Sequence, residues 1–345
     1  MKAAIYHEFR QPISIQNLED PNPGDNGVVI KVEASGLCLS DWHGWMGHDK
    51  EIKLPQVPGH ELAGYIVEVG KNVKHWARDQ RITVPFVGGC GKCDPCNNGN
   101  QQLCDHQFQP GFTAWGSFAE FVAIDYADEN LVALPEHLDF VSAASLGCRF
   151  ITAYRAIKEQ GKLKPQQYLA VHGCGGVGLS AIQIGKALGA KVIAIDISDK
   201  KCELAASMGA DYWVNASTQV VVEAVKDISK GGVHLSIDAL GSTETCLNSI
   251  LNLRKSGKHI QVGLMAADDE NPHIPMSLII ANELEILGSH GMQAHKYNEM
   301  FDLIASAGIN LKKMVSDTVT LDDIPALLPK MDQFKTSGIT VVNSF

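Results

Sequence analysis

The chain has 345 residues, which is enough for two domains that each bury a hydrophobic core. It carries 29 Lys and Arg residues against 39 Asp and Glu residues, a net charge of −10, and 45% of its residues are hydrophobic. An acidic chain without a basic cluster is a poor candidate for binding nucleic acid or an anionic membrane. We therefore expect neither partner.

The start of the chain and its cysteines bear on the compartment. In Met1–Glu8, charged residues come before any apolar run, which does not fit a signal peptide. No apolar run is long enough to cross a bilayer. Four of the nine cysteines crowd between residues 90 and 104, and without an export signal this pattern favours metal ligands over disulfides. We expect a reducing, cytoplasmic setting.

Residues 1 to about 147 consist of short β-rich runs joined by Gly and Pro turns, with little helical periodicity. The runs are Val28–Ala34, Ala63–Gly70, Gln80–Pro85 and Gly116–Val122. This pattern predicts an all-β, partly closed barrel.

Within this part lies the spacing Cys-x2-Cys-x2-Cys-x7-Cys, formed by Cys90, Cys93, Cys96 and Cys104. Four thiolates suit tetrahedral zinc and leave no open position, so we predict a structural site. Four unrelated thiols or two disulfides are the alternative, although such close spacing strains disulfide geometry. An iron–sulfur cluster is a second alternative.

A second metal site is predicted at Cys38, His60 and Cys148, which folding would have to bring together. The alternative is that Cys38 and His60 are ordinary core residues. However, Ser40 and Asp41 place polar groups beside Cys38, and Glu61 directly follows His60. We expect Asp41 to accept the free ring N–H of His60. Three ligands would leave a fourth position open, as in catalytic zinc sites.

Residues from about 148 to 286 alternate between strand and helix patterns. An apolar strand, Tyr168–His172, runs into Gly173–Gly178 and then into an amphipathic helix that ends near Leu188. A second strand, Lys191–Asp196, ends in a carboxylate. The later predicted elements are roughly Asp199–Met208, Tyr212–Val214, Ser217–Ile228, Val233–Asp238, Ser242–Leu253 and Lys258–Val262. This alternation predicts a doubly wound parallel sheet.

The glycine motif has the strand and helix context of a dinucleotide-binding fingerprint, and Asp196 follows 23 residues after Gly173. Glycines there let the backbone approach a pyrophosphate held at the helix N-terminus. Asp196 would accept hydrogen bonds from the ribose hydroxyls and repel a 2′-phosphate, which predicts NAD over NADP. The alternative is a glycine turn needed only for packing.

The last part of the chain, from about residue 287, contains no catalytic motif. It predicts helices at Ala294–Ala307 and Leu321–Met331, where prolines obscure the ends of the second, and a strand at Ser337–Val342. We expect this tail to return to the first domain and complete its sheet. The expected domains are therefore residues 1–147 with 287–345, and residues 148–286.

Taken together, these motifs resemble the zinc-dependent alcohol dehydrogenases of the medium-chain dehydrogenase/reductase superfamily, over essentially the whole chain. The motifs that carry the resemblance are Gly36–Asp41, Gly59–Glu61, the four-cysteine lobe, Gly147–Cys148 and Gly173–Gly178. The resemblance implies an α/β two-domain fold. It consists of a GroES-like, partly closed β-barrel catalytic domain and a Rossmann domain that binds NAD.

The resemblance also implies roles for single residues. Cys38, His60 and Cys148 match catalytic zinc ligands, Glu61 matches a carboxylate that can approach the metal between turnovers, and Ser40 and His43 match a proton relay, with Asp41 beside them. The implied cofactor contacts are Gly173, Gly175, Gly176, Val177, Gly178, Asp196, Lys201, Thr152, Val262, Gly263 and Leu264. A Cys at position 148 points to alcohol dehydrogenases, since polyol dehydrogenases tend to carry a carboxylate there.

The implied activity is the interconversion of primary alcohols with aldehydes. A broader substrate range would include secondary alcohols and ketones. A hydride would pass to and from NAD while zinc polarises the substrate oxygen. Two zinc ions per subunit, one catalytic and one structural, and a homotetramer are implied as well. The alternatives are a polyol or amino-alcohol dehydrogenase of the same superfamily, or a non-catalytic redox sensor that binds NAD and zinc.

Three positions depart from the family pattern. Leu39 stands where many relatives carry a basic residue, and the closing strand Gly338–Val342 lacks an Arg that several relatives have. Both changes should lower the affinity for NAD. Arg149 places an unexpected charge directly after Cys148, and the sequence offers no role for it.

Overall fold

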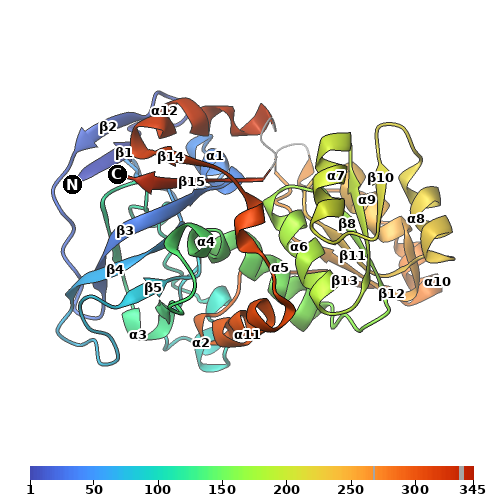
Figure 1. Cartoon of the computed structure of the whole chain (residues 1–345), viewed down its shortest axis with the longest axis horizontal. Coiled ribbons are helices and arrows are strands. Elements are labelled where there is room, and N and C mark those ends of the chain that lie inside the picture. The colour runs from blue at the N-terminus through green and yellow to red at the C-terminus, as the bar shows by residue number, and fades with distance from the viewer. Residues whose placement is uncertain (267–268, 334–337) are drawn as a thin grey trace. The chain divides into compact units, whose positions relative to one another are not determined.

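The computed structural model describes residues 1–266, 269–333 and 338–345. The chain forms two compact units, shown with their elements labelled in Figure 1. Unit 1 comprises Met1–Ile151, Gly291–Asp302 and Asn310–Phe345, and unit 2 comprises Thr152–His290 and Leu303–Ile309.

Unit 1 is built around a seven-stranded sheet with the strand order β14-β15-β3-β4-β5-β7, in which β6 also pairs with β3. The strands of this sheet are β3 (Val28–Leu37), β4 (Glu61–Val69), β5 (Arg81–Thr83), β6 (Phe121–Ile124), β7 (Val132–Ala133), β14 (Val315–Thr320) and β15 (Ile339–Ser344). A separate antiparallel pair consists of β1 (Lys2–Ile5) and β2 (Ser14–Asn17).

The long strand β3 is the centre of this sheet. One edge pairs with β4, while the other edge pairs with β6 in its first half and with β15 in its second half. Gly64 on β4 makes the contact with β3 possible, since a Cβ there would lie 2.0 Å from the Lys31 carbonyl oxygen. The C-terminal segment thus completes the sheet of the first unit, as the sequence predicted. The first residue of that predicted strand, Ser337, lies outside the described residues.

The core of unit 1 consists of aliphatic side chains from these strands. Ile30, Leu62, Ile66 and Ile82 are fully buried in one cluster. Each such side chain contributes about 1.5–3 kcal/mol when it leaves water. This packing fixes the end of β3, which Cys38 follows, and the start of β4, which His60 precedes.

The helical segments of unit 1 are short. They are α1 (Leu39–Trp45), α2 (Asp94–Asn97), η1 (Gln101–Leu103), α3 (Ala127–Asn130), α4 (Phe140–Ala144), η2 (Leu146–Phe150), η5 (Ala294–Lys296), η6 (Leu311–Met314), η7 (Leu321–Asp323), α12 (Ile324–Leu327) and η8 (Leu328–Gln333). Two further helices, α5 (Ile151–Tyr154) and α11 (Tyr297–Ala307), carry residues of both units. The sequence did not predict α1, because seven residues are too few to show a helical period.

Unit 2 is a six-stranded parallel sheet with the order β10-β9-β8-β11-β12-β13. Its strands are β8 (Tyr168–His172), β9 (Lys191–Asp196), β10 (Tyr212–Asn215), β11 (Val233–Asp238), β12 (Leu253–Gln261) and β13 (Glu285–Gly288). Its helical segments are η3 (Arg155–Gln160), α6 (Gly176–Ala187), α7 (Asp199–Ser207), α8 (Val221–Ser229), α9 (Thr243–Leu251) and α10 (Met276–Asn282). The strand order reverses direction beside β8, so the predicted doubly wound sheet is confirmed.

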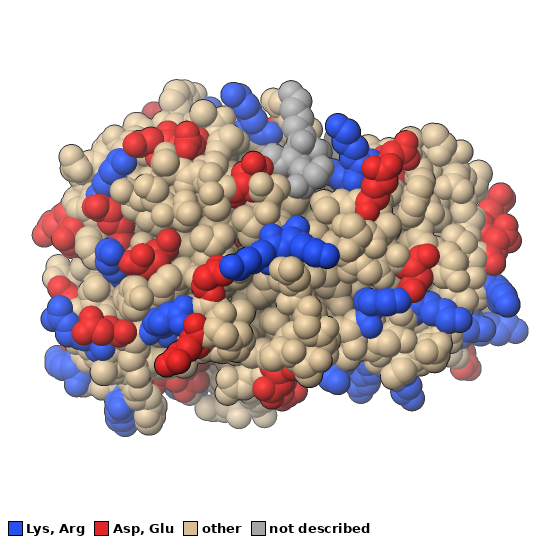
Figure 2. Space-filling view, viewed as in Figure 1, with Lys and Arg blue, Asp and Glu red and all other residues tan. Residues whose placement is uncertain are grey.

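Helix length and surface charge bear on whether the protein binds membranes or nucleic acids. Within the described residues, every helix is too short or too polar to cross a lipid bilayer. On the face shown in Figure 2, Lys and Arg side chains are interspersed with Asp and Glu side chains. That face therefore offers no continuous basic track for a phosphate backbone.

Candidate metal centres and nucleotide-binding loop

Three buried side chains of unit 1 meet at one point. Cys38 precedes the first residue of α1, His60 precedes the first residue of β4, and Cys148 lies in the π-helical turn η2. Their ligand atoms all lie within 4.8 Å of one another. Each side chain is thus held at the end of a regular element or in an irregular turn beside one. π-Helical turns of this kind are frequent at functional sites.

Asp41 ties two of these segments together. Its Oδ1 accepts hydrogen bonds from Nδ1 of His60 over 2.8 Å and from the Gly59 backbone N–H over 3.0 Å. Its Oδ2 accepts the Cys38 backbone N–H over 2.9 Å. The hydrogen bond between His60 and Asp41 is the one the sequence predicted. It assigns the ring proton to Nδ1 and leaves Nε2 as the nitrogen with a free lone pair.

The residues fit a divalent metal. Nε2 of His60 is completely buried and has no hydrogen-bond partner among the described residues, which is unusual for a polar atom. The pKa of Cys38 lies well below its usual range because Cys148 donates to its sulfur, and for the same reason the pKa of Cys148 lies well above it. Two cysteine sulfurs beside an imidazole nitrogen are a donor set suited to zinc.

The carboxylate of Glu61, on the first residue of β4, is engaged by Arg149. The Arg149 backbone N–H and its Nε–H each donate to Oε1 over 3.0 Å, and Nη2 donates to Oε2. Both side chains are buried. The charge of Arg149, which the sequence left unexplained, therefore has a partner. The two residues are 88 positions apart, so no local pattern could have indicated the pair.

The residues expected to relay a proton lie on α1. Oγ of Ser40 is 3.7 Å from Sγ of Cys38. Nδ1 of His43 is 2.8 Å from Nδ1 of His48, and the Trp42 ring packs edge-on against both imidazoles. Burial, together with the charge of His48, lowers the pKa of His43. No local pattern pointed to His48, which follows a turn at Gly47, a residue with a φ of +79°.

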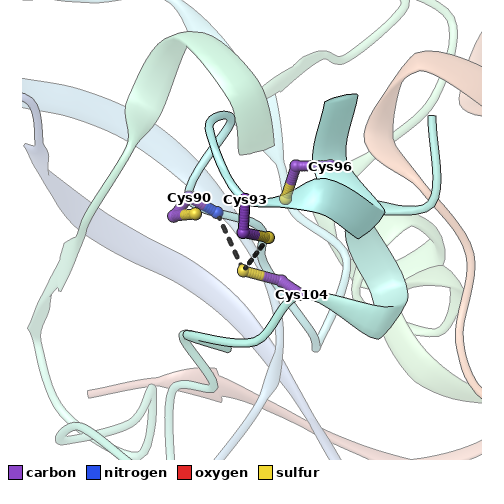
Figure 3. A group of neighbouring side chains, drawn as sticks. All are labelled: Cys90, Cys93, Cys96 and Cys104. Carbon is purple, nitrogen blue, oxygen red and sulfur yellow. Dashed lines mark hydrogen bonds between the residues drawn. The ribbon is translucent and has the colours of Figure 1, made fainter. Parts of the chain in front are cut away.

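The four cysteines of the predicted structural site converge, as Figure 3 shows. Their sulfurs all lie within 4.8 Å of one another, and those of Cys93 and Cys104 are 3.6 Å apart. None of the nine cysteines forms a disulfide, so the disulfide alternative was wrong. The sulfur of Cys104 also accepts backbone N–H groups from Cys90 over 3.3 Å and His106 over 3.2 Å.

Backbone N–H groups stabilise negative charge on the cysteine sulfurs of this lobe. Burial alone would raise the pKa of Cys90, but the backbone N–H groups of Lys92 and Cys93 lower it to about 6. Burial raises the pKa of Cys96 to about 12, and a bound cation would displace its proton. Four sulfurs and no further ligand fit a closed, tetrahedral site.

In unit 2, the glycine loop joins β8 to α6. Gly173 has a φ of +90°, a conformation that favours glycine. A Cβ on Gly178 would lie 1.8 Å from the Gly173 carbonyl oxygen, so only glycine lets the helix approach the loop. A Cβ on Gly175 would meet open space, and the first turn of the 12-residue helix α6 begins there. This is the cradle that a pyrophosphate needs.

Asp196, at the end of β9, lies beside this loop. Its Oδ2 accepts the Cys174 backbone N–H over 2.9 Å, and its Oδ1 accepts the Ser198 backbone N–H over 3.0 Å. These bonds orient the carboxylate and leave lone pairs for further donors.

The remaining expected cofactor contacts are spread over unit 2. Val177 lies in the first turn of α6, Lys201 lies on α7, and Thr152 lies on α5. The segment after β12 folds back, because the N–H groups of Val262 and Gly263 both bond to the Asp238 carbonyl oxygen, over 3.1 and 2.8 Å. Leu264 is 57% exposed.

Two family models match the chain. Residues 24–136 match the alcohol dehydrogenase GroES-like domain, and residues 176–306 match the zinc-binding dehydrogenase family. The first match covers most of the β-rich part, and the second covers most of the parallel sheet.

Known proteins agree with these matches. The chain is 34% identical to an alcohol dehydrogenase of Geobacillus stearothermophilus, covering 99% of this chain and 98% of that one. It is 35% identical to an NAD-dependent alcohol dehydrogenase of Sulfurisphaera tokodaii, covering 99% of both. The crystal structure of the alcohol dehydrogenase of Aeropyrum pernix matches with a TM-score of 0.88 at 30% identity, over 99% of this chain and all of that one.

These similarities cover 99% of the chain, and the α/β two-domain fold expected from the sequence is confirmed. The chain belongs to the zinc-dependent alcohol dehydrogenases of the medium-chain dehydrogenase/reductase superfamily.

Proposed function

We propose that this protein is an NAD-dependent alcohol dehydrogenase that interconverts primary or secondary alcohols with aldehydes or ketones. The observation that carries the proposal is the buried group of Cys38, His60 and Cys148, in which Nε2 of His60 lacks a partner. Three ligands on one metal leave a position for a substrate oxygen. The relative from Sulfurisphaera tokodaii, named an NAD-dependent alcohol dehydrogenase, supports the choice of cofactor.

When bound, zinc supplies a Lewis acid for the substrate oxygen, and NAD accepts or returns the hydride. The residues of this chain orient the site and move the proton. Asp41 holds the His60 ring with Nε2 available, and the two thiolates neutralise a divalent charge. Ser40 and His43, both on α1, would pass the proton outward.

Asp196 is the proposed determinant of NAD over NADP. Its carboxylate is oriented by two backbone N–H groups and carries a negative charge beside the glycine loop. A ribose 2′-hydroxyl can donate to it, whereas a 2′-phosphate would be repelled. The contacts with Thr152, Lys201 and the Val262–Leu264 backbone remain proposals of the same kind.

A second zinc is proposed at Cys90, Cys93, Cys96 and Cys104, where it would stabilise the lobe and take no part in the chemistry. The closed set of four sulfurs supports this assignment. The protein would then hold two zinc ions per subunit.

The domain assignment and the assembly are proposals as well. We assign residues 1–147 and 287–345 to the catalytic domain and residues 148–286 to the NAD-binding domain. A homotetramer is supported by the sheet-end strand β13 and by exposed apolar side chains at Met276 and Ile280 on α10. The lack of disulfides among the nine cysteines supports a reducing cytoplasmic setting.

An NAD-linked assay over primary, secondary, polyhydric and amino alcohols tests the function, run with metal quantification. We expect NADH formation with simple alcohols, and Cys148→Ser should abolish it while one metal per chain is lost and the fold is retained. Preference for polyols or amino alcohols would reassign the substrate. No turnover with any alcohol by the fully metallated protein would favour a redox sensor instead.

A further inference from the structure

We infer that Arg149 is a positioning residue that holds the Glu61 carboxylate off the metal bound by Cys38, His60 and Cys148, so that the fourth position stays open to substrate. The inference rests on the proposed metal at these three residues. It assigns a role to a charge that neither the metal ligands nor the proton relay requires.

Glu61 needs such a restraint because of where the chain places it. It directly follows the ligand His60, and the ligand Cys148 directly precedes Arg149. A carboxylate is itself a good zinc ligand. A buried anion on the residue next to a metal ligand would compete for the open position on the cation unless something else held both oxygens.

Arg149 holds both oxygens from two directions. Its guanidinium contacts Oε1 through Nε and Oε2 through Nη2, a bidentate geometry that lysine cannot reproduce. Its own backbone N–H makes a third contact, to Oε1 over 3.0 Å. Because this last donor belongs to the main chain of η2, the carboxylate is fixed to the segment that carries Cys148.

Gly36 on β3 makes room for the pair. A Cβ at this position would lie 2.4 Å from Oε2 of Glu61 and 2.8 Å from Nη2 of Arg149. The backbone of Gly36 does not have the positive φ that would by itself call for glycine. Glycine inside a strand often marks a close approach, and here the approaching group is the ion pair.

The charges favour the same arrangement. Two thiolates and a neutral imidazole already balance a divalent ion, and Glu61 with Arg149 forms a second neutral set. Transfer of the Glu61 carboxylate to the metal would add a negative charge to the group formed by the metal, the two thiolates and the imidazole. It would also leave the buried Arg149 unpaired, which is costly. Without the guanidinium that penalty disappears. The Arg149 backbone N–H would still hold Oε1, but Oε2 would lose its partner and would be able to bind the metal.

The test uses protein loaded with Co²⁺ and follows its visible absorption during titration with imidazole, a ligand for the open position. The four-cysteine site has no open position and should not respond. We expect Arg149→Met to lower imidazole affinity at least tenfold and to slow metal loss to a chelator, because Glu61 now ligates. The double variant Glu61→Gln/Arg149→Met should restore both values to within about twofold of the wild-type protein.

Unchanged imidazole affinity and metal loss in folded, cobalt-loaded Arg149→Met would overturn the inference. If Arg149→Met does not fold, Arg149→Lys replaces it. We then expect a smaller loss of imidazole affinity, which adding Glu61→Gln reverses. An affinity equal to that of the wild-type protein would count against a positioning role for Arg149. The wild-type protein should show a sulfur-to-cobalt charge-transfer band that is lost in Cys148→Ser. If it shows no such band, the proposed metal site itself is overturned.

Discussion

The Asp41 carboxylate accepts the Nδ1–H of His60 over 2.8 Å, and this one hydrogen bond decides which imidazole nitrogen is free. The same carboxylate also receives the backbone N–H groups of Cys38 and Gly59. One buried anion thereby holds two of the three candidate metal ligands in place.

Asp41→Asn should therefore weaken metal binding without unfolding the protein. Asparagine keeps the shape but loses the charge that orients and polarises the ring, so we expect a loss of about 10- to 100-fold in metal affinity. Competition with a metal-sensitive chelator measures it. Asp322→Asn, which removes an exposed carboxylate paired with Lys2, is the control and should bind metal like the wild-type protein. Equal affinity in both variants would disprove the role of Asp41.

Removal of a ligand from the four-cysteine lobe should cost stability before it costs chemistry. Cys104→Ser removes a sulfur that receives two backbone N–H groups, and the lobe would lose its proposed zinc. Every kcal/mol lost lowers the melting temperature by about 2–4 °C in a unit of this size. We expect a fall of several degrees in calorimetry while kcat at low temperature stays near the wild-type value. A loss of kcat with unchanged melting would exchange the roles of the two metal sites.

Asp196→Ala should relax the preference for NAD over NADP. Hydrogen bonds to charged groups contribute about 1.5–3 kcal/mol, so the ratio of kcat/KM for the two cofactors should shift by about 10- to 100-fold toward NADP. Asp199→Ala is the matched control, because its carboxylate lies on the same strand-to-helix connection but bonds to Asn215. If the NADP-to-NAD ratio of kcat/KM changes equally in both variants, Asp196 does not discriminate between the two cofactors at the ribose.

His48→Gln should raise the pKa of His43. Burial is the main cause of the lowered pKa of His43, and the positive charge of His48 adds to it. Glutamine keeps a polar partner but cannot become charged, so His43 should gain its proton at a higher pH than in the wild-type protein. An NMR titration of the His43 ring checks this. A pKa that stays the same or falls would show that the two imidazoles, 2.8 Å apart in this structure, do not interact electrostatically.

The elements that the sequence predicted well are those with a clear local period. The strand, glycine loop and helix around Gly173 appear as β8 and α6, and the parallel sheet follows from the repeated alternation after them. The short strands of unit 1 were located less accurately. Of the run predicted at Gly116–Val122, only Phe121 and Val122 lie in a strand, β6, which continues to Ile124. Pairing with β3 sets its bounds, and local composition does not.

The sequence by itself determined what local patterns carry: the spacing of the four cysteines, the glycine fingerprint and the residue types that could serve as metal ligands. Tertiary structure alone decided how distant residues act on one another. The pairing of Arg149 with Glu61 spans 88 positions, and the meeting of Cys148 with Cys38 depends on how β3, β4 and η2 pack. Contacts of this kind leave no local period in the chain, since hydrophobic packing and buried charge select them only once the chain has folded.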